Sequence, residues 1–459
     1  MTTLDKKAKF KLSERNLAVL VFSLFFSWLL SIPFEGKTLY LLLAKFHMNV
    51  SDYIFKSIAA HLLGLISCWL FIKNIRAAKK LIYTSIAACI LGTSVFFFKP
   101  SQLWQVSLIV CSFLSGASVA GWAFYFKETA KSDERMKMAA DGLIFSNVLM
   151  ICINIAASTI SVYVGLLLST ALLVAGFIFA LKLPEISNYE QGYSSTNISV
   201  SKPLTLLCIF IVIITINSGL MYQVINPNFS HHETLVSWYW AMPYIASIII
   251  MRRLSSAKRT YMLYVAIALM GLGFVSFLVL NNSAVSYILI DTLMLSAFGI
   301  YDFFWWSAMG EMLDYTHNPS RLMGIVLSAN VMGVLAGGYA GSIIYSSGNN
   351  KFNSSLLALV VVFVILIILP VLHNQLNAMA KSHFNFESKK KTEKLHNALH
   401  QLTDRETQVA ELLLKGRTYK MIAEELYLSE NTVKTHIKNI YSKLNIQSKT
   451  ELIKMLNKQ

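Results

Sequence analysis

Charged residues are scarce in this chain of 459 residues, since Asp, Glu, Lys and Arg together make up only 14% of it. Soluble proteins carry about a quarter charged residues, so this composition excludes an ordinary soluble domain for most of the chain. The scarcity is uneven, because the last 86 residues hold 15 of the 40 Lys and Arg residues. Such a change in composition predicts a membrane domain followed by a small soluble domain.

Cysteine is also scarce, and the pattern of its five copies excludes a disulfide-rich or zinc-bound fold. No two of them form a C-x-x-C pair, and all lie in apolar runs, where Cys packs as a small hydrophobic residue. The sequence also lacks a cluster of metal ligands, a nucleophile motif and a phosphate-binding loop. We therefore expect no enzyme activity and no cofactor.

A signal-peptide cleavage site is missing as well. The first apolar run, 17–32, follows a basic segment, but no small-residue cleavage site comes after it and many further apolar runs follow. We therefore expect a cytoplasmic N-terminal segment over 1–16 and a first membrane helix directly after it.

Apolar runs long enough to cross a bilayer, which takes about 20 residues, are abundant. The predicted fold class is all-α: a twelve-transmembrane-helix bundle in two six-helix pseudo-repeats, plus a C-terminal four-helix helix-turn-helix domain. The membrane domain covers 17–373, with halves 17–183 and 204–373, and the short apolar piece 39–46 is expected to be interfacial. The predicted spans are 17–34, 53–72, 81–98, 103–126, 142–161, 163–183, 204–225, 236–251, 260–280, 285–309, 322–346 and 355–373.

The basic residues predict the orientation of these spans. Lys and Arg gather in the N-terminal segment and in the loops after the second, fourth and eighth spans, while the intervening loops have few. Because basic loops stay on the cytoplasmic side, we expect a multi-pass protein with both termini in the cytoplasm.

The two halves resemble each other. KNIRAAKK at 73–80 has a counterpart in RRLSSAKR at 252–259, and GLIFS at 142–146 matches GIVLS at 324–328. Over about residues 10–373 the chain resembles the major facilitator superfamily in this architecture of two parallel six-helix halves. The superfamily pattern GxxxDRxxRR is only partly kept in FIKNIRAAKK, which lacks the Gly and the Asp; this departure argues against ordinary transport.

Ionisable residues inside the spans are candidates for a binding site, because charge at membrane depth is costly. Asp291 and Asp302 lie eleven residues apart in the tenth span, which places them on one helix face about 16 Å apart. Beside Tyr301, these carboxylates are predicted to bind a cation or a polar ligand; the alternative is an interhelical hydrogen bond. His61, in the second span, is either a ligand contact or a packed residue.

Other polar and aromatic residues in the spans are given structural roles. Trp305 and Trp306 are predicted to lie in an aromatic belt at the membrane interface. Asn147, Asn154 and Asn217 are expected to form hydrogen bonds between helices.

The tail begins with a polar, Lys-rich linker over 374–399, which is either flexible or a continuation of the last helix, and the C-terminal domain covers 400–459. Thr403 with Glu406 predicts a capping box, Gly416 a helix end and Ser429 a third-helix cap; Ser448 with Glu451 predicts a capping box for the fourth helix. In that third helix an apolar stripe alternates with a basic, exposed face, the geometry that enters the DNA major groove. The stripe consists of Val433, Ile437, Ile440 and Leu444.

This segment resembles the LuxR-type helix-turn-helix domain. The shared pattern is LTxRE, Gly, IAxxL, Ser and TVKxHxxxIxxKL, which the chain carries between residues 402 and 444. The resemblance implies double-stranded DNA as a partner and a homodimer formed through the fourth helix. The implied DNA-binding residues are Lys420, Asn431, Thr432, Val433, Lys434, His436, Lys438 and Lys443.

Together these features predict a membrane-embedded one-component transcription regulator of the bacterial cytoplasmic (inner) membrane. Its partners are the lipid bilayer, promoter DNA and an unknown small-molecule ligand. The alternative is a secondary transporter with a regulatory tail.

Overall fold

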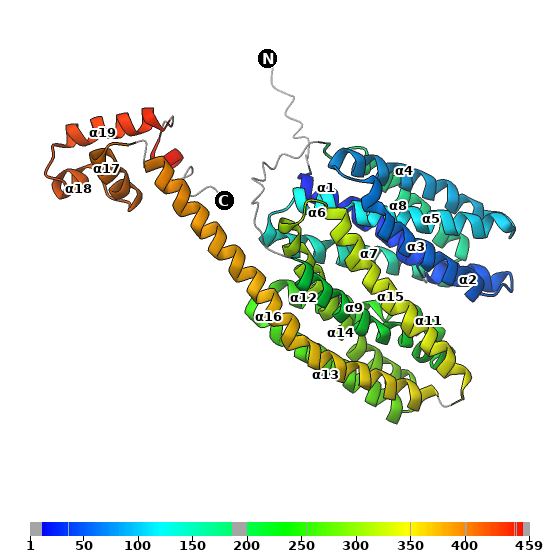
Figure 1. Cartoon of the computed structure of the whole chain (residues 1–459). Coiled ribbons are helices and arrows are strands. Elements are labelled where there is room, and N and C mark those ends of the chain that lie inside the picture. The colour runs from blue at the N-terminus through cyan, green and yellow to red at the C-terminus, as the bar shows by residue number, and fades with distance from the viewer. Residues whose placement is uncertain are drawn as a thin grey trace, which may run out of the picture. The chain divides into compact units, whose positions relative to one another are not determined.

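The computed structural model describes residues 12–34, 36–185, 200–254, 256–348, 350–399, 402–444, 446 and 448–452, and within them every regular element is helical. The chain divides into two compact units, one of residues up to Leu376 and one from Asn377 onward. Figure 1 labels their helices.

The first half of the membrane unit has a helix at each predicted span, but the helices at the third and fifth spans begin six and ten residues earlier than predicted, at residues 75 and 132. Its elements are α1 (Glu14–Ser31), α2 (Lys37–Lys45), α3 (Ser51–Phe71), α4 (Ile75–Ser94), η1 (Val95–Phe97), α5 (Gln102–Gly121), α6 (Ala123–Glu128), α7 (Ser132–Thr159) and α8 (Val162–Ala180). The piece 39–46, expected to be interfacial, lies in the separate short helix α2.

The second half contains more breaks. Its elements are α9 (Ser201–Leu220), the π-turn η2 (Met221–Ile225), α10 (Asn226–Asn228), η3 (Ser230–His232), α11 (Glu233–Trp238), α12 (Ala241–Arg253), α13 (Ser256–Val279), α14 (Ala284–Met312), η4 (Leu313–Tyr315), α15 (Pro319–Ser346) and α16 (Asn350–Leu399). Among the described residues, eleven helices are long and apolar enough to cross a membrane. The predicted span 236–251 falls across the break between α11 and α12, so it is a pair of short helices.

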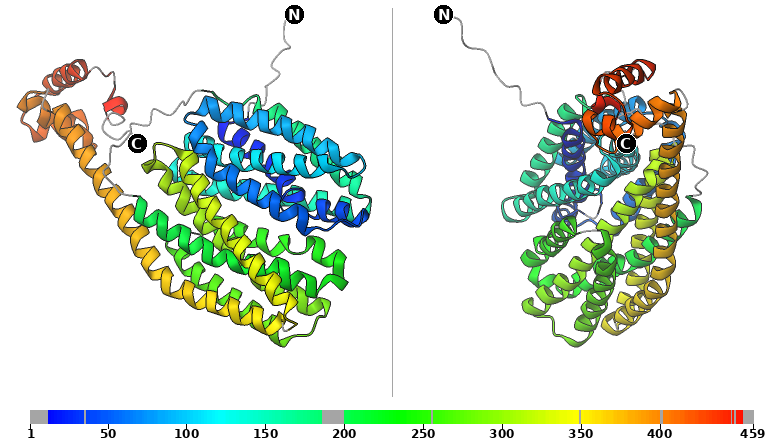
Figure 2. Two further views of the ribbon diagram at one scale, coloured as in Figure 1. Left: turned by 45° about the vertical axis from the view of Figure 1, so that its right-hand side comes forward. Right: turned by 90° about the vertical axis from the view of Figure 1, so that its left-hand side faces the viewer.

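The two halves form neighbouring groups of helices (Figure 2), and they meet through corresponding elements. The fifth span packs on the eighth (α7 on α12) and the eleventh packs on the second (α15 on α3). Gly324, in the repeated GIVLS segment, permits the second contact, because a Cβ there would lie only 2.4 Å from the carbonyl oxygen of Leu65. The predicted all-helical fold with two six-helix pseudo-repeats is confirmed.

Ion pairs join the halves at the end of the bundle where α1 begins. The Asp141 carboxylate on α7 lies 2.6 Å from Arg15 Nη2 and 3.0 Å from Arg252 Nη2. Arg135, only 2% exposed, pairs with Asp314 Oδ1 at 2.7 Å and donates to the Gly310 carbonyl oxygen. We call Arg135, Asp314, Asp141 and Arg252 the inter-half ion-pair cluster; all four lie outside the FIKNIRAAKK segment.

The C-terminal unit contains α17 (Asp404–Leu414), α18 (Tyr419–Glu425) and α19 (Glu430–Lys443), and residues 449–452 begin a further helix. The predicted capping box of Thr403 and Glu406 is present, and the Oγ atoms of Ser429 and Ser448 accept backbone N–H groups. For Ser448 this bond, from Glu451 N, is one of the two bonds of its predicted capping box. Gly416 ends α17 with a φ of +85°. The segment 374–399 is helical, as part of α16.

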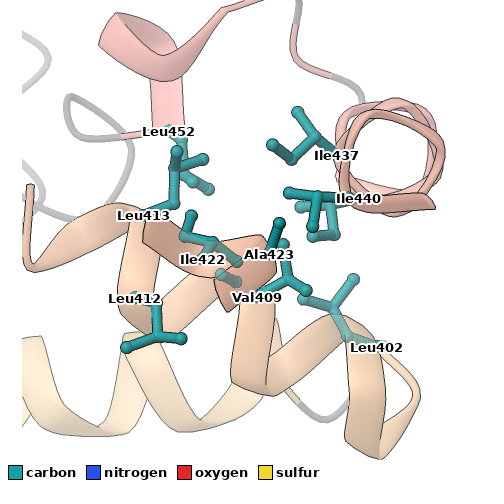
Figure 3. Close-up of a cluster of buried hydrophobic side chains, with 11 residues drawn as sticks. Leu402, Val409, Leu412, Leu413, Ile422, Ala423, Ile437, Ile440 and Leu452 are labelled. Carbon is teal, nitrogen blue, oxygen red and sulfur yellow. The ribbon is translucent and has the colours of Figure 1, made fainter. Parts of the chain in front are cut away.

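The helices of the C-terminal unit enclose one apolar core (Figure 3). In that view Val409 and Leu413 of α17, Ile422 of α18 and Ile440 of α19 point toward a shared centre. Three residues of the predicted apolar stripe are buried there, and Leu444 packs against the core as a partly buried residue. The core consists of Leu402, Val409, Ala410, Leu412, Leu413, Ile422, Ala423, Val433, Ile437, Ile440 and Leu452.

Candidate functional site

A cavity of about 580 Å³ lies within the membrane unit and is lined by residues of both halves. This volume is within the range of small-molecule sites, about 300–1,000 Å³. The cavity brings together two of the predicted ligand-binding residues, His61 from α3 and Asp302 from α14.

Asp302 is held in a fixed orientation by two neutral donors. The Tyr244 hydroxyl on α12 donates to Asp302 Oδ2 at 2.7 Å, and Trp305 Nε1, one turn further along α14, donates to Oδ1 at 3.1 Å. A carboxylate has about four acceptor positions. These two bonds therefore orient the group and leave it able to accept further hydrogen bonds.

His61 is buried on the wall formed by the first half. Its Nδ1 lies 3.0 Å from Ser115 Oγ on α5, and its ring packs 5.6 Å from the ring of Phe34. The imidazole is thus packed against its protein neighbours and also forms part of the cavity wall.

Asp291 and Tyr301 do not line this cavity. Asp291 is 1% exposed and lies one helical turn from Tyr287, and Tyr301 packs edge-on against Phe210 of α9 with 6.3 Å between ring centroids. Asp291 and Asp302 lie on one face of α14 but far apart along its axis, so their side chains have different neighbours. Tyr301 neighbours Asp302 in sequence and is turned about 100° away from it.

The prediction of an interfacial belt for Trp305 and Trp306 is wrong. Both are buried, at 1% and 2% exposure, and both line the cavity. Their rings stack at 5.2 Å, and Trp306 also packs edge-on against Phe22 and Phe126. The bond from Trp305 to Asp302 accounts for its polar atom inside the protein.

The prediction about Asn147 and Asn154 is also wrong. Their amide nitrogens bond within α7, to the Leu143 carbonyl oxygen and to Met150 Sδ, and both side chains line the cavity. Hydrophobic periodicity identifies the face of a helix that points inward. It does not tell whether that face packs on another helix or lines a cavity.

Another part of the wall comes from the interrupted end of the seventh span. Met221, Tyr222, Asn226 and Pro227 lie in or just after the π-turn η2 and all line the cavity. π-turns are frequent at functional sites. The N-P-N sequence within a membrane segment was the signal that sequence reasoning passed over.

The cavity reaches the end of the bundle opposite the inter-half ion-pair cluster. Its exposed lining residues, Tyr222 and Ser230, follow the C-terminal end of α9, and Lys37 and Tyr40 belong to α2, beyond the C-terminal end of α1. Arg15 of the opposite end starts α1. The cavity is therefore exposed at the end of the bundle opposite these ion pairs.

The second candidate site is the outer face of α19. Asn431, Thr432, Lys434 and Lys438 are exposed along one helix, and His436 is half-buried beside them. Lys420, near the start of α18, is also exposed. This arrangement matches the expected helix-turn-helix surface of basic and hydroxyl side chains.

Two of the predicted DNA-binding residues are placed differently. Val433 is 0% exposed and lies in the core of the C-terminal unit, so the prediction of a direct DNA contact for its side chain is corrected: it supports α19 from within. Lys443 is 40% exposed at its side chain, and its Nζ lies 2.6 Å from Glu406 Oε2. Its charge is therefore partly neutralised inside the domain.

Known proteins resemble the C-terminal unit in sequence. The family model for bacterial regulatory proteins of the luxR family matches residues 400–456. The transcriptional regulatory protein DegU of Brevibacillus brevis is 46% identical over 55 residues, 12% of this chain and 23% of that protein. The spore germination protein GerE of Bacillus subtilis is 44% identical over 52 residues, 11% of this chain and 70% of GerE.

The chain spans only 23–37% of the length of the first three curated relatives it matches. Their similarity thus concerns the C-terminal unit alone.

Solved structures resemble the remainder in fold. A bacterial homologue of the iron transporter ferroportin, in an outward-facing state, matches 79% of this chain and 100% of its own with a TM-score of 0.59 and 14% identity. The human organic anion transporter MFSD10 matches 77% of this chain and 98% of its own, with a TM-score of 0.59 and 13% identity. At these identities the likeness concerns the fold.

These relatives are regulators and transporters rather than enzymes. The membrane unit has the fold of a major facilitator superfamily transporter, and the apolar helices make the chain a multi-pass membrane protein. Through residues 400–456, which form a LuxR-type DNA-binding domain, the chain belongs to the luxR family of bacterial regulatory proteins.

Proposed function

We propose that this chain is a membrane-embedded one-component transcription regulator of the bacterial cytoplasmic membrane. In this proposal the membrane unit binds a small molecule and the C-terminal domain binds promoter DNA. The observation that carries it is the presence, in one chain, of a luxR-family domain and a ligand-sized cavity lined by both halves of a transporter-like fold.

The proposed topology places both termini in the cytoplasm, with domains 17–373, 374–399 and 400–459. Supporting it, the basic residues Arg15, Lys127, Arg135 and Arg252 gather at one end of the bundle, as is typical of the cytoplasmic side. The cavity mouth then faces away from the cytoplasm, so the ligand comes from outside.

The proposed signal is a shift between two arrangements of the halves. A ligand favours whichever arrangement it binds more tightly. The last span and the 374–399 segment belong to the single helix α16. In this proposal a movement of the last span therefore also moves the segment that leads to the C-terminal domain. On DNA, two tails pair through the helix that begins at residue 449.

The proposed DNA contacts are those of the exposed face of α19. Thr432 and Lys434 approach bases or backbone, Asn431, His436 and Lys438 approach nearby phosphates or bases, and Lys420 approaches a phosphate. Lys443 remains in this set with a charge shared with Glu406. The set is Lys420, Asn431, Thr432, Lys434, His436, Lys438 and Lys443.

Chromatin immunoprecipitation of the tagged full-length protein in its native cells tests the proposal. We expect a few sharp sites for the wild type and loss of these sites for Lys434→Ala, because a lost base contact weakens binding by about 1–3 kcal/mol. Lys415→Ala, an exposed lysine at the end of α17, is the charge-matched control and should retain the sites. Equal occupancy by the Lys434→Ala variant would refute the assignment of that residue.

The alternative is a secondary transporter with a regulatory tail, and the solved transporters of similar fold favour it. A transporter would move its substrate across the membrane after deletion of residues 395–459. Absence of any chromatin site, together with flux through the truncated protein, would replace the regulator with the transporter.

A further inference from the structure

The chemistry of the cavity wall identifies a class of ligand. We propose that the cavity binds an organic cation, an amine-type positive charge carried on an apolar or aromatic body. This inference shares one assumption with the proposed function, namely that the cavity is the ligand site.

The first observation is the placement of acceptors. Asp302 is the one acidic side chain among the described residues that line the cavity. Its two protein donors, Tyr244 and Trp305, are neutral. Neither of these contacts therefore balances the negative charge of the Asp302 carboxylate. A bound ammonium group would supply both the opposite charge and additional donors.

Two further acceptors in the wall lack a donor. Asn154 Oδ1 and Asn226 Oδ1 are buried and accept no hydrogen bond from the described part of the protein, and both residues line the cavity. A buried acceptor without a donor is costly. A ligand rich in N–H groups would satisfy these atoms, whereas a carboxylate ligand would repel them.

The second observation is the aromatic surface beside Asp302. Trp305, Trp306 and Tyr244 line the cavity together with Phe298, and the two indole rings are stacked. Aromatic faces attract cations within about 6 Å, and most strongly in a desolvated site. The same rings cover the apolar body of the ligand.

Lys37 also lines the cavity, and it belongs to α2 at the open end. An anionic ligand would pair with Lys37 instead of Asp302. The experiment must therefore compare cations and anions of equal shape.

The test is isothermal titration of the purified full-length protein in detergent with benzylammonium, benzyltrimethylammonium, benzyl alcohol and benzoate. We expect saturable binding of at least one cation, with the alcohol and benzoate at least tenfold weaker. Benzyltrimethylammonium has no N–H donor, so its strength relative to benzylammonium tells whether the aromatic faces or the acceptors contribute more.

Two variants on α14 make the test specific. Asp302→Asn should weaken cation binding by roughly tenfold or more, the factor expected from losing a charged hydrogen bond. Asp291→Asn makes the same change at a buried carboxylate outside the cavity and should leave cation binding within about twofold. Size-exclusion chromatography is the folding control, and both variants should elute as a single monodisperse peak at the same volume as the wild type run beside them.

Three results would overturn the inference: benzoate binding as tightly as the cations, undiminished cation binding by Asp302→Asn, or no saturable binding of either cation. None of them depends on DNA. Cation binding without any chromatin site would retain the cavity assignment and reject the regulator, so the two failures are distinguishable.

Discussion

Glu406 connects the first and third helices of the C-terminal domain. Its Oε2 accepts from Thr403 N at 2.8 Å, from Thr403 Oγ1 at 3.0 Å and from Lys443 Nζ at 2.6 Å. Burial opposes ionisation, but the bonds from Lys443 and Thr403 outweigh it and hold the pKa of Glu406 below its usual value. The ionised carboxylate therefore stabilises the folded domain.

The stabilisation by Glu406 has a predictable pH dependence. A depressed pKa contributes stability that is complete above the unfolded value of about 4.3 and is lost as the pH falls through the folded value. Glu406→Gln in a 400–459 fragment should cost about 1–2 kcal/mol at pH 7, measured by urea unfolding. That difference from the wild type should shrink as the pH falls below about 4.

The control for this prediction is Glu411→Gln, an exposed glutamate on the same helix α17, which should change stability little at either pH. A constant difference between wild type and Glu406→Gln from pH 7 to pH 3 would contradict the role of the ionised form.

Single residues also show how far sequence reasoning reaches. The caps at Thr403, Gly416 and Ser429 follow from local chemistry and are confirmed. Val433 belonged to two predicted sets, the buried stripe and the DNA-binding residues, and the structure assigns it to the first. Pattern matching marks a position in a family, while burial decides what its side chain contacts.

At the scale of elements, α7 joins the halves through two acidic–basic contacts. Replacing Arg135 by Gln leaves Asp314 without its cation and removes the bond to the Gly310 carbonyl oxygen. Losing such charged hydrogen bonds should destabilise the arrangement in which the two halves touch at this end by about 1–3 kcal/mol. A larger fraction of molecules should then separate at this end.

Electron–electron distance measurements between spin labels at Lys131 and His317, in a background without native cysteines, would detect that separation as a longer distance population. Lys79→Gln is the control, because the Lys79–Glu185 ion pair joins α4 to the residues just after α8 and does not connect the two halves. An unchanged distance distribution in Arg135→Gln would show that the cluster does not hold the halves together.

Elements also mark what hydropathy can predict. Uninterrupted apolar helices such as α13 and α14 were predicted within a few residues, because lipid requires long helices. The break between α11 and α12 and the π-turn η2 were not, although they form part of the cavity wall. Breaks in helices depend on neighbours that satisfy the freed backbone groups, and hydropathy carries no information about those neighbours.

At the scale of the whole molecule, the two units have separate cores. A protein truncated after Leu399 should therefore still bind benzylammonium with the affinity of the full chain, while its chromatin sites disappear. Titration of the truncated protein checks the first outcome and immunoprecipitation the second. Loss of cation binding on truncation would show that the cavity depends on the tail.

The two-part organisation was predictable from the sequence, but the composition of the cavity was not. His61 and Asp302 come from different halves, and only the packing of one half on the other places them around the same space. Asp291 is also a carboxylate on the same face of the same predicted span as Asp302, but it is buried outside the cavity.

The inter-half ion-pair cluster has a consequence for sensitivity. On the proposed function, any compound that works by separating this end must first supply the free energy that these contacts contribute, and each 1.4 kcal/mol raises the required concentration about tenfold. On that proposal, the strength of the cluster determines the ligand concentration at which the regulator responds. Replacing Asp141 or Asp314 by a neutral residue would then give a regulator that responds at a lower ligand concentration. The residues that line the cavity would be unchanged.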